Sequence, residues 1–533
     1  MITRIKATNY RCFQDLDFIP NQDLNIIVGD NEAGKSTLLE IISLLISGRV
    51  RGRWATEDLN PYWFNRDVVQ DYFDAIEGGK SPDLPEIDIE IFFNQDTSGV
   101  ERLRGINNSI KEDCPGLRMR VQPDPDHSDE LKEYLDSKEL PRLIPTDLFA
   151  VSWLDFSGEV VTRQPRGLGF ALVNSDTSTT YSGIDYKLRE LIREFVSPQE
   201  GAKIAIAHRS AKAEINNKIL REVNQRIESQ DESFGVSLQM DQGAGANWDT
   251  AVVPHIEDTP FSMLGQGRQV STKIALAMSR AADHSQFALV EEPENHLSHT
   301  QMQIVIERIR SLAGGRQLFI TTHSSFVLNR LGLGFLHLMH EARIVRLGIP
   351  EISEDTISYF QKQSGYDTLR LALASKVVVV EGPSDEMIFN LAYKKINGVE
   401  PRMKGIDVIT LGTRGKRALE LGKAMGRKMA VLRDNDNKDP EHWRKAAAKF
   451  LEDGKRELFI GKVDLGETLE PQVAKAGDNM TKLKNLLELK DGDDVVAAMS
   501  NDKTEWAWQV AQSELDLEWP QYFKDAIEFI DVD

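Results

Sequence analysis

Five carboxylate residues in the C-terminal half stand where predicted strands end, at spacings that suit metal chemistry. Glu381 ends an apolar run, and Asp385 follows four residues later. Asp434 and Asp436 end another apolar run, and Glu470 follows a third. Parallel strands bring their C-terminal ends to one edge of a sheet, so these acids can converge there. Because converged carboxylates repel one another without a cation, the pattern predicts a site for divalent metal ions that cleave phosphodiesters.

A phosphate-binding loop is the second group of residues with a chemistry of its own. Residues 29–36 satisfy the pattern Gly-x-x-x-x-Gly-Lys-Ser/Thr, between an apolar strand and a predicted helix. The glycines let backbone N–H groups and the helix N-terminus face phosphates. In such a loop Lys35 reaches the β- and γ-phosphates of ATP, and Ser36 holds Mg²⁺. The predicted nucleotide-binding residues are Gly29, Asn31, Gly34, Lys35, Ser36 and Thr37.

The middle of the chain carries the acids and the histidine that an ATPase needs beside such a loop. An apolar strand ends in Glu291 and Glu292, which we predict to hold the Mg²⁺ shell and to polarise the attacking water, respectively. His323 ends the next apolar strand, where it can sense the γ-phosphate. Upstream, Gly265 and Gly267 form a glycine-rich turn before a predicted helix. This turn is either a signature loop that contacts the γ-phosphate bound on another subunit or an ordinary turn.

The elements that must position these residues follow an α/β pattern. Apolar runs alternate with helical segments from Phe261 to about Leu338, and again from Lys376 to about Glu470. Residues 186–228 have helical spacing with an apolar stripe, broken near Ser197. That stripe is either part of a core or a face for a partner.

Composition narrows the class of protein and of metal. Two isolated cysteines, Cys12 and Cys114, make neither a disulfide framework nor a zinc site, so oxygen ligands and Mg²⁺ or Mn²⁺ are expected. No apolar run approaches the ~20 residues that cross a bilayer, and the N-terminus lacks the apolar core of a signal peptide. We therefore expect a cytoplasmic protein that has no membrane partner.

Charge bears on nucleic-acid binding in two ways. The net charge of −20 argues against wrapping nucleic acid with the whole surface. Residues 401–438, however, hold ten Lys or Arg against four acids. Taken alone, such a run is more often a solvated helix surface, but its place inside the predicted nuclease favours a DNA-binding face.

The ATPase motifs resemble those of ABC-type ATPases of the SMC and RecF kind, although the sustained heptads of SMC proteins are absent. Glu-Gly at 381–382, followed at strand spacing by Asp-x-Asp at 434–436, resembles the Toprim fold. The further acid at 385 and Thr468-x-Glu470 look specifically like the OLD (overcoming lysogenization defect) family. This resemblance implies that Thr468 supports the metal site, that Lys503 stabilises the transition state, and that the metal ligands are Glu381, Asp385, Asp434, Asp436 and Glu470.

We therefore predict an α/β protein in which an ABC-type ATPase head with a helical dimerisation insertion precedes a Toprim, Rossmann-like nuclease domain. The ATPase head is expected at 1–160 and 236–350, on either side of the insertion at 161–235. A connector is expected at 351–371 and the Toprim domain at 372–533. By resemblance, the protein binds ATP with one Mg²⁺ and holds two more ions in the Toprim site. A homodimer or larger homo-oligomer is also expected.

The predicted function is metal-dependent endonucleolytic cleavage of DNA, as a nickase or on both strands, in defence against phage. A partner protein encoded in the same operon is a further expectation. One alternative is a RecF- or SMC-like DNA-binding ATPase or recombination mediator with a non-catalytic Toprim domain. Another is a topoisomerase or primase, but no tyrosine lies in a convincing winged-helix module.

Overall fold

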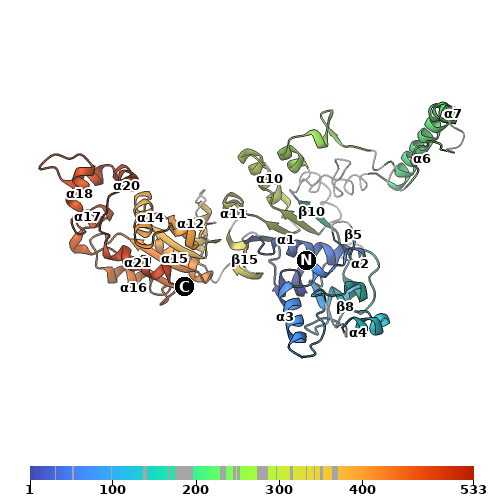
Figure 1. Ribbon diagram of the computed structural model, residues 1–533, viewed down its shortest axis with the longest axis horizontal. Coiled ribbons are helices and arrows are strands. Elements are labelled where there is room, and N and C mark those ends of the chain that lie inside the picture. Colours follow the sequence, from blue (N-terminus) through green and yellow to red (C-terminus); the bar gives the residue numbers. More distant parts are fainter. Residues whose placement is uncertain are drawn as a thin grey trace. The chain divides into compact units, whose positions relative to one another are not determined.

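The computed structural model describes most of the chain (Figure 1). The residues outside the description are 30–31, 51–52, 98, 136–140, 166–167, 175–195, 229–235, 244–247, 249–251, 273–285, 296, 313–315, 332, 341, 348–351, 363–369, 372 and 533. Contacts divide the chain into two compact units. The first comprises Met1–Leu24 and Ser36–Thr321, and the second comprises Asn25–Lys35 and Thr322–Asp533. The boundaries of the predicted segments stay predictions.

An antiparallel sheet opens the first unit. Its strands are β1 (Ile2–Tyr10), β2 (Phe13–Phe18), β6 (Ile87–Phe93), β7 (Arg104–Gly105), β8 (Cys114–Pro123) and β9 (Phe149–Asp155). Their order is β2-β1-β6-β8-β7, and β9 also pairs with β8. Alternation along β1 buries Ile5 and Ala7 on the same face, as the two-residue period of a strand requires.

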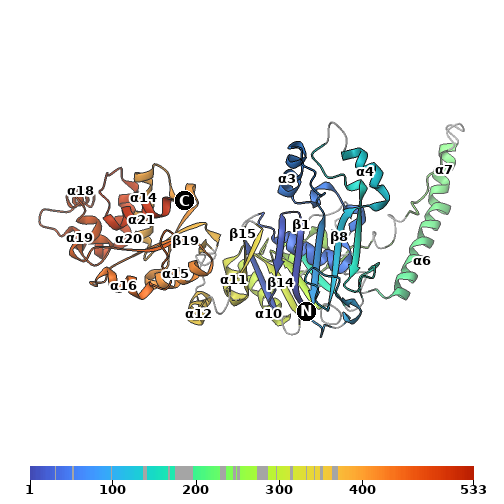
Figure 2. The same ribbon diagram turned by 90° about the horizontal axis from the view of Figure 1, so that it is seen from below.

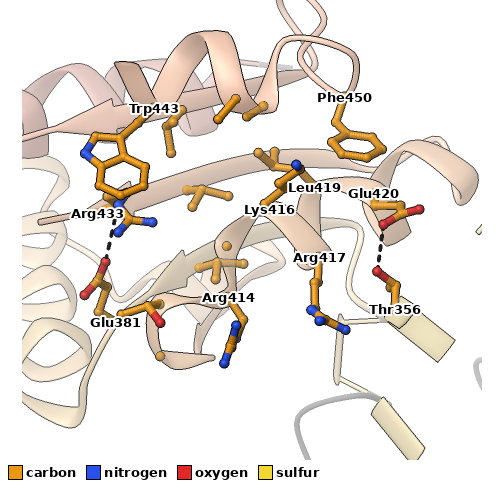
Figure 3. Close-up of a pocket in the computed structure, with 18 of the residues that line it drawn as sticks. Thr356, Glu381, Arg414, Lys416, Arg417, Leu419, Glu420, Arg433, Trp443 and Phe450 are labelled. Carbon is orange, nitrogen blue, oxygen red and sulfur yellow. Dashed lines mark hydrogen bonds and ion pairs between the residues drawn. The ribbon is translucent and has the colours of Figure 1, made fainter. Parts of the chain in front are cut away.

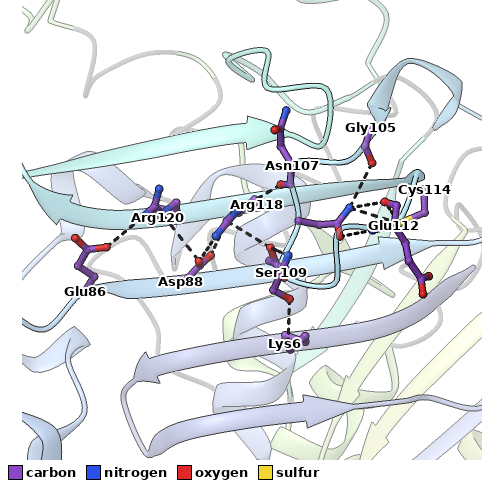
Figure 4. A network of polar contacts seen from close by, with 12 residues as sticks. Lys6, Glu86, Asp88, Gly105, Asn107, Ser109, Glu112, Cys114, Arg118 and Arg120 are labelled. Carbon is purple, nitrogen blue, oxygen red and sulfur yellow. Dashed lines mark hydrogen bonds and ion pairs between the residues drawn. The ribbon is translucent and has the colours of Figure 1, made fainter.

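Ion pairs cross this sheet between β6 and β8 (Figure 4). Arg118 of β8 pairs with Asp88 of β6, and its Nε lies 3.4 Å from Glu90 Oε1. Ser109 donates its backbone N–H to the same Glu90 oxygen at 2.8 Å. Burial raises the pKa of the Glu90 carboxyl group, so these two partners offset the cost of keeping it charged. The network favours one register of β6 against β8.

Parallel strands carry the predicted ATPase motifs. In the first unit, β10 (Phe170–Asn174), β13 (Phe287–Glu291) and β14 (Gln317–Thr321) pair in parallel, in that order. In the second unit, β3 (Leu24–Gly29) pairs in parallel with β15 (Leu336–His340), which pairs antiparallel with β16 (Arg343–Leu347). Every residue of β3 and β14 is buried, as expected for strands that are covered on both faces.

A buried amide ties the antiparallel sheet to the parallel strands of the first unit. Gln317, at the start of β14, is 0% exposed. Its Oε1 accepts from the backbone N–H of Ile2 at 2.6 Å, and its Nε2 donates to the carbonyl oxygens of Ile2 at 2.9 Å and Asn21 at 2.7 Å. These bonds satisfy main-chain groups that are shut off from water.

The helices of the first unit vary in length and burial. They include α1 (Lys35–Ser47), α2 (Ala55–Asp58), α3 (Arg66–Glu77), α4 (Ser128–Leu135), α6 (Pro198–Ile215), α7 (Arg221–Glu228) and α10 (His299–Leu312). The predicted break near Ser197 is a helix start, because Ser197 and Glu200 form a capping box at the N-terminus of α6. Ile206 and Ile219 of the predicted apolar stripe are exposed. The rest of the predicted insertion lies largely outside the described residues.

A four-stranded parallel sheet organises the C-terminal portion of the second unit. Its strands are β17 (Lys376–Val380), β18 (Ile406–Thr410), β19 (Lys428–Arg433) and β20 (Arg456–Ile460), in the order β18-β17-β19-β20. Helices α14 (Pro383–Asn397), α20 (Lys503–Gln512) and α21 (Gln521–Asp531) cover one face, and α15 (Gly415–Ala424) and α16 (Pro440–Ala447) cover the other (Figure 2). The helices α17 (Leu469–Ala474), α18 (Asn479–Leu486) and α19 (Val495–Asn501) follow β20.

The sequence places small and apolar residues where these layers meet. Phe389 of α14 packs against Phe523 of α21, with ring centroids 5.6 Å apart. On the opposite face, a Cβ added to Gly415 would lie 2.5 Å from Val431 Cγ1, so the start of α15 approaches β19 closely. Glycine therefore permits the contact that holds α15 against the sheet.

A short helix in the predicted connector docks on this sheet domain. Helix α12 (Glu354–Lys362) contacts both α11 (Ser325–Leu331) and α15. Ser353 and Thr356 donate hydroxyl and backbone hydrogen bonds to the Glu420 carboxylate, at 2.7–3.1 Å. Among the described residues, no helix has the length and apolar character that a bilayer crossing requires.

Candidate functional site

The edge formed by the C-terminal ends of β17 and β19 carries the first acids of the site. Glu381 follows β17 directly, and the next residue, Gly382, caps helix α14. Asp385, in the first turn of α14, accepts the backbone N–H of Gly382 at 3.0 Å. Ser384 donates its hydroxyl to the carbonyl oxygen of Lys503 at 2.8 Å. The start of α14 thus fixes Asp385 beside Glu381 and brings α20 to the same edge.

Electrostatic coupling shows that these acids lie near one another. Burial, followed by repulsion from Asp385, Glu381 and Glu470, raises the pKa of Asp434 to about 8. Burial, followed by repulsion from Glu381, raises the pKa of Asp385 to about 7. Burial also raises the pKa of Glu381. Glu381, Asp385, Asp434 and Glu470 therefore lie close enough to influence one another's charge, while their role as metal ligands stays a prediction.

Glu470 is the most buried acid of this group and carries the contact with the predicted lysine. It lies in the first turn of α17 and is 2% exposed. Thr468 donates its hydroxyl to Glu470 Oε2 at 2.5 Å. Lys503 Nζ lies 3.6 Å from Glu470 Oε1, while about half of the lysine side chain stays exposed. The Lys503 ammonium group can therefore face both buried Glu470 and an anion that approaches from solvent.

Asp436 lies apart from the other four predicted ligands. Its carboxylate accepts from Arg433 Nη2 at 2.8 Å, it is about half exposed, and its backbone is left-handed with φ 51°. Arg433 also lies 3.8 Å from Glu381 Oε1, so it bridges Asp436 to the acid cluster. Sequence reasoning missed this arginine, although its place beside Asp434 at the end of β19 was the available signal.

Two further residues that the sequence did not single out shape the site. Asn435 is 0% exposed and donates its amide to the carbonyl oxygens of Gly461 at 3.2 Å and Gly466 at 2.7 Å. It thereby joins the loop after β19 to the loop after β20. Burial, with repulsion from all four acids, raises the pKa of Tyr522 well above its ordinary value, so this phenol of α21 lies near them. No local pattern marks Tyr522, because the packing of α21 creates that position.

The donor set fits a hard divalent cation. Among the described residues, no three His, Cys, Asp or Glu side chains already stand close enough together to enclose a metal ion. Glu381 Oε1 is nonetheless buried without a hydrogen-bond donor. The clustered groups offer only oxygen atoms, which Mg²⁺ and Mn²⁺ prefer, and a cation would offset the repulsion that raises the pKa values.

The phosphate loop has the tight geometry that its glycines predict. Lys35 is 6% exposed, and its Nζ donates to the Gly29 carbonyl oxygen at 2.9 Å. A Cβ at Gly29 would lie 2.3 Å from Met339 O, and Gly34 has a left-handed φ of 105°. Other residues would not fit these two positions. Ser36 is exposed, Thr37 is half-buried, and Asn31 lies outside the described residues.

The predicted catalytic acids of the ATPase stand at the end of β13. Glu291 is the last residue of the strand, and Glu292 follows with a left-handed φ of 44°. The backbone N–H of Glu292 donates to Thr321 O at 3.0 Å, and Asn295 donates its amide to Glu292 Oε2 at 2.8 Å. The second acid is therefore held by the neighbouring strand and by its own turn, as a water-orienting carboxylate needs to be.

The remaining predicted ATPase residues lie on turns. Gly265 is exposed, and its carbonyl oxygen accepts from the backbone N–H groups of Arg268 and Gln269 at 2.9 and 3.1 Å. A helical turn therefore starts at Gly265 and includes Gly267. Most of the helix predicted after it lies outside the described residues. His323 is half-buried, two residues beyond β14.

Comparisons with known proteins give this arrangement a family. The model for an AAA domain, described as a putative AbiEii toxin of a type IV toxin–antitoxin system, matches residues 24–329. The model for the TOPRIM domain of overcoming lysogenization defect proteins matches residues 373–436.

Individual relatives agree with the family models. The OLD nuclease of Thermus scotoductus is 22% identical over 82% of this chain and 82% of its own length. The Old nuclease of Escherichia phage P2 is 26% identical over 34% of this chain and 35% of its own length. A solved structure of the C-terminal region of the Xanthomonas campestris pv. campestris OLD protein is 18% identical, with a TM-score of 0.23, and covers 30% of this chain and 92% of that chain. The chain therefore belongs to the AAA family of the first model and, through its TOPRIM domain, to the OLD family of nucleases with an ATPase domain.

Proposed function

We propose that the protein is an ATP-binding and ATP-hydrolysing, metal-dependent DNA endonuclease, cutting one strand or both. The observation that carries the proposal is the group of four acids, in which burial and then mutual repulsion raise the pKa of Asp434 to about 8. Such a group is costly to bury unless it binds cations. A non-catalytic Toprim domain would have no use for it, which favours a nuclease over a binding-only recombination mediator.

Each residue of the proposed metal centre has a defined task. Glu381, Asp385, Asp434 and Glu470 would hold two divalent ions, which when bound supply an activated water and neutralise the leaving oxygen. Asp436 would join this set by exchanging its Arg433 partner for metal. Thr468 positions the Glu470 carboxylate through the 2.5 Å hydrogen bond.

Lys503 has the charge and the exposure for a different task. Its Nζ lies 3.6 Å from buried Glu470 and stays about half exposed, so it can meet a phosphate that approaches from solvent. We assign it to stabilising the negative charge that grows on the phosphate oxygens as the phosphodiester breaks.

In the proposed ATPase site, Lys35 and Ser36 would contact the phosphates and one Mg²⁺. Glu291 would complete the Mg²⁺ shell, and Glu292 would orient the attacking water. His323 would sense the γ-phosphate. The glycine-rich turn at Gly265 and Gly267 would contact nucleotide on a second copy of the chain.

The wider setting belongs to the same proposal. The ATPase head would span 1–160 and 236–350, with dimerisation through 161–235, and the nuclease domain would span 372–533 beyond the connector 351–371. Family resemblance supports a homo-oligomer that acts in the cytoplasm against phage DNA, with a partner encoded in the same operon. Apolar Ile206 and Ile219, exposed on the described helices of the insertion, are available for that contact.

The test compares wild type, Glu381→Ala and Lys35→Ala on supercoiled plasmid, with Mg²⁺ or Mn²⁺ and with or without ATP. We expect Glu381→Ala to abolish cleavage and Lys35→Ala to remove the response to ATP. Glu400→Ala, which alters a half-exposed acid three residues beyond the C-terminal end of α14, serves as the control. Undiminished cutting by Glu381→Ala would reject the metal centre.

A further inference from the structure

A cavity of about 520 Å³ lies beside Glu381 in the second unit, on the sheet face that α15 and α16 cover (Figure 3). Its inner surface is apolar, with Val379, Val431 and Leu458 contributed by three neighbouring strands. Glu381 belongs both to the acid cluster and to the wall of this cavity. The cavity therefore borders the proposed site of phosphodiester cleavage at Glu381.

The rim of the cavity carries an excess of positive charge. Its lining includes five Lys or Arg side chains and three acids. One of those acids, Glu420, is already engaged by hydrogen bonds from Ser353 and Thr356. Among the described residues, neither Arg414 nor Lys416 has an ion-pair partner, and both belong to the basic segment 401–438. Two cations on the rim are thus available to an anionic ligand.

Aromatic rings complete the lining. The Arg433 guanidinium lies 3.5 Å from the centroid of the Trp443 ring, and Phe450 stands at the far side of the cavity in Figure 3. Aromatic rings and stacked guanidinium planes are the surfaces on which unpaired bases rest in single-strand binding proteins. The cavity thus offers apolar and aromatic surface to a base and cations to its phosphates.

We propose that this cavity is a subsite for one unpaired nucleotide of a DNA strand, next to the scissile phosphodiester. The volume falls in the range of about 300–1,000 Å³ that is typical of sites for small ligands. A duplex, whose major groove alone is about 12 Å wide, is too large to enter. The inference rests on the proposed nuclease function, because the subsite is defined by its position next to Glu381 of the proposed metal centre. The protein accordingly prefers DNA with an unpaired segment at the cleavage point.

The test measures the anisotropy of fluorescein-labelled DNA of about 12 nucleotides, single-stranded or as a blunt duplex, in EDTA so that binding is separated from cleavage. Wild type is expected to bind the single strand about tenfold more tightly than the duplex. The double variant Arg414→Ala, Lys416→Ala removes rim charge, and Ala446→Trp fills the cavity without removing charge. Both are expected to abolish the preference.

Matched controls use Arg402→Ala with Lys404→Ala, and Ala448→Trp, which change exposed residues outside the lining. Equal binding of both probes by wild type, or an intact preference in both cavity variants, overturns the subsite. Plasmid cleavage by the same proteins is measured separately with Mn²⁺. Absent cleavage with an intact binding preference rejects the proposed nuclease function and leaves the cavity as a nucleotide site.

Discussion

Burial and the neighbouring carboxylates raise the pKa of Asp385 to about 7 and that of Asp434 to about 8, from an ordinary value of 3.8. Between the ordinary and the raised pKa, the folded protein binds more protons than the unfolded chain. The free energy of unfolding therefore falls as the pH rises from about 4 to about 8 in the absence of metal. Divalent cations would compete with those protons, so their binding strengthens over the same range.

A first prediction follows from this linkage. In EDTA, the melting temperature of the protein falls as the pH rises from about 5 to about 8, and Mn²⁺ restores stability most strongly at the upper end. Asp434→Asn removes the carboxyl group whose pKa is raised to about 8 and flattens the pH dependence, while Asp453→Asn, at an exposed position, leaves it unchanged. Thermal denaturation across this pH range measures both effects. A wild-type melting temperature that does not change with pH over this range would contradict the prediction.

A second prediction separates Lys503 from the metal ligands. Lys503→Ala lowers the rate of cleavage by about 10²–10³-fold, the usual cost of losing one group that stabilises transition-state charge. The stabilisation of the fold by Mn²⁺ stays intact, because an ammonium group is no metal ligand. Lys503→Arg restores some of the rate, and Lys524→Ala on α21 is the matched surface control. Loss of Mn²⁺ stabilisation together with cleavage would show a structural role instead.

The candidate metal centre was only partly predictable from the sequence. Strand-end position sufficed to bring Glu381 and Asp434 to one edge, because parallel strands share the direction of their ends. Glu470 instead reaches the other acids from the first turn of α17. The same pattern could not reveal that Asp436 forms an ion pair with Arg433, because this contact depends on the left-handed backbone at Asp436. Tyr522, far along the chain, reaches the cluster only through tertiary packing.

At the scale of elements, apolar runs predicted the parallel strands well, because a strand that is buried on both faces carries apolar side chains at nearly every position. β17 begins at Lys376, where the apolar run begins, and β19 ends at Arg433, beside the predicted acids. Residues whose role depends on partners distant in the sequence could not be predicted from it. Gln317 begins a strand whose sequence is otherwise mostly apolar, yet its amide joins the antiparallel sheet to the parallel strands of the first unit.

A third prediction concerns this amide. Gln317→Ala leaves three buried main-chain groups without their partner, and each unpaired group costs about 1–3 kcal/mol. We expect a lower urea midpoint for the first unit, measured by equilibrium unfolding. Gln70→Ala, at an exposed position on α3 in the same unit, should leave the midpoint unchanged. An unaltered midpoint in Gln317→Ala would show that other bonds hold the sheets together.

At the scale of the molecule, the phosphate loop and the candidate nuclease site belong to one compact unit. That unit contains Asn25–Lys35 and everything from Thr322 onward, including His323. Helix α11 begins two residues after His323 and packs on α12, which in turn packs on α15. The N-terminal end of α15 borders the cavity beside Glu381. The packed helices α11, α12 and α15 therefore link His323, the proposed γ-phosphate sensor, to the proposed nuclease site.

The last prediction tests the contact between α12 and α15, where Ser353 and Thr356 donate hydrogen bonds to the Glu420 carboxylate. A coupling free energy of about 1–3 kcal/mol would let ATP change the cleavage rate by about 5- to 150-fold. Glu420→Ala and Thr356→Val loosen α12 from α15, so the ratio of cleavage rates with and without ATP should move toward one in both variants. Glu400→Ala should keep the wild-type ratio. Because the readout is a ratio, a general loss of activity does not mimic the effect. A wild-type ratio in both variants would mean that ATP reaches the nuclease site by a route other than α12, such as contact between subunits.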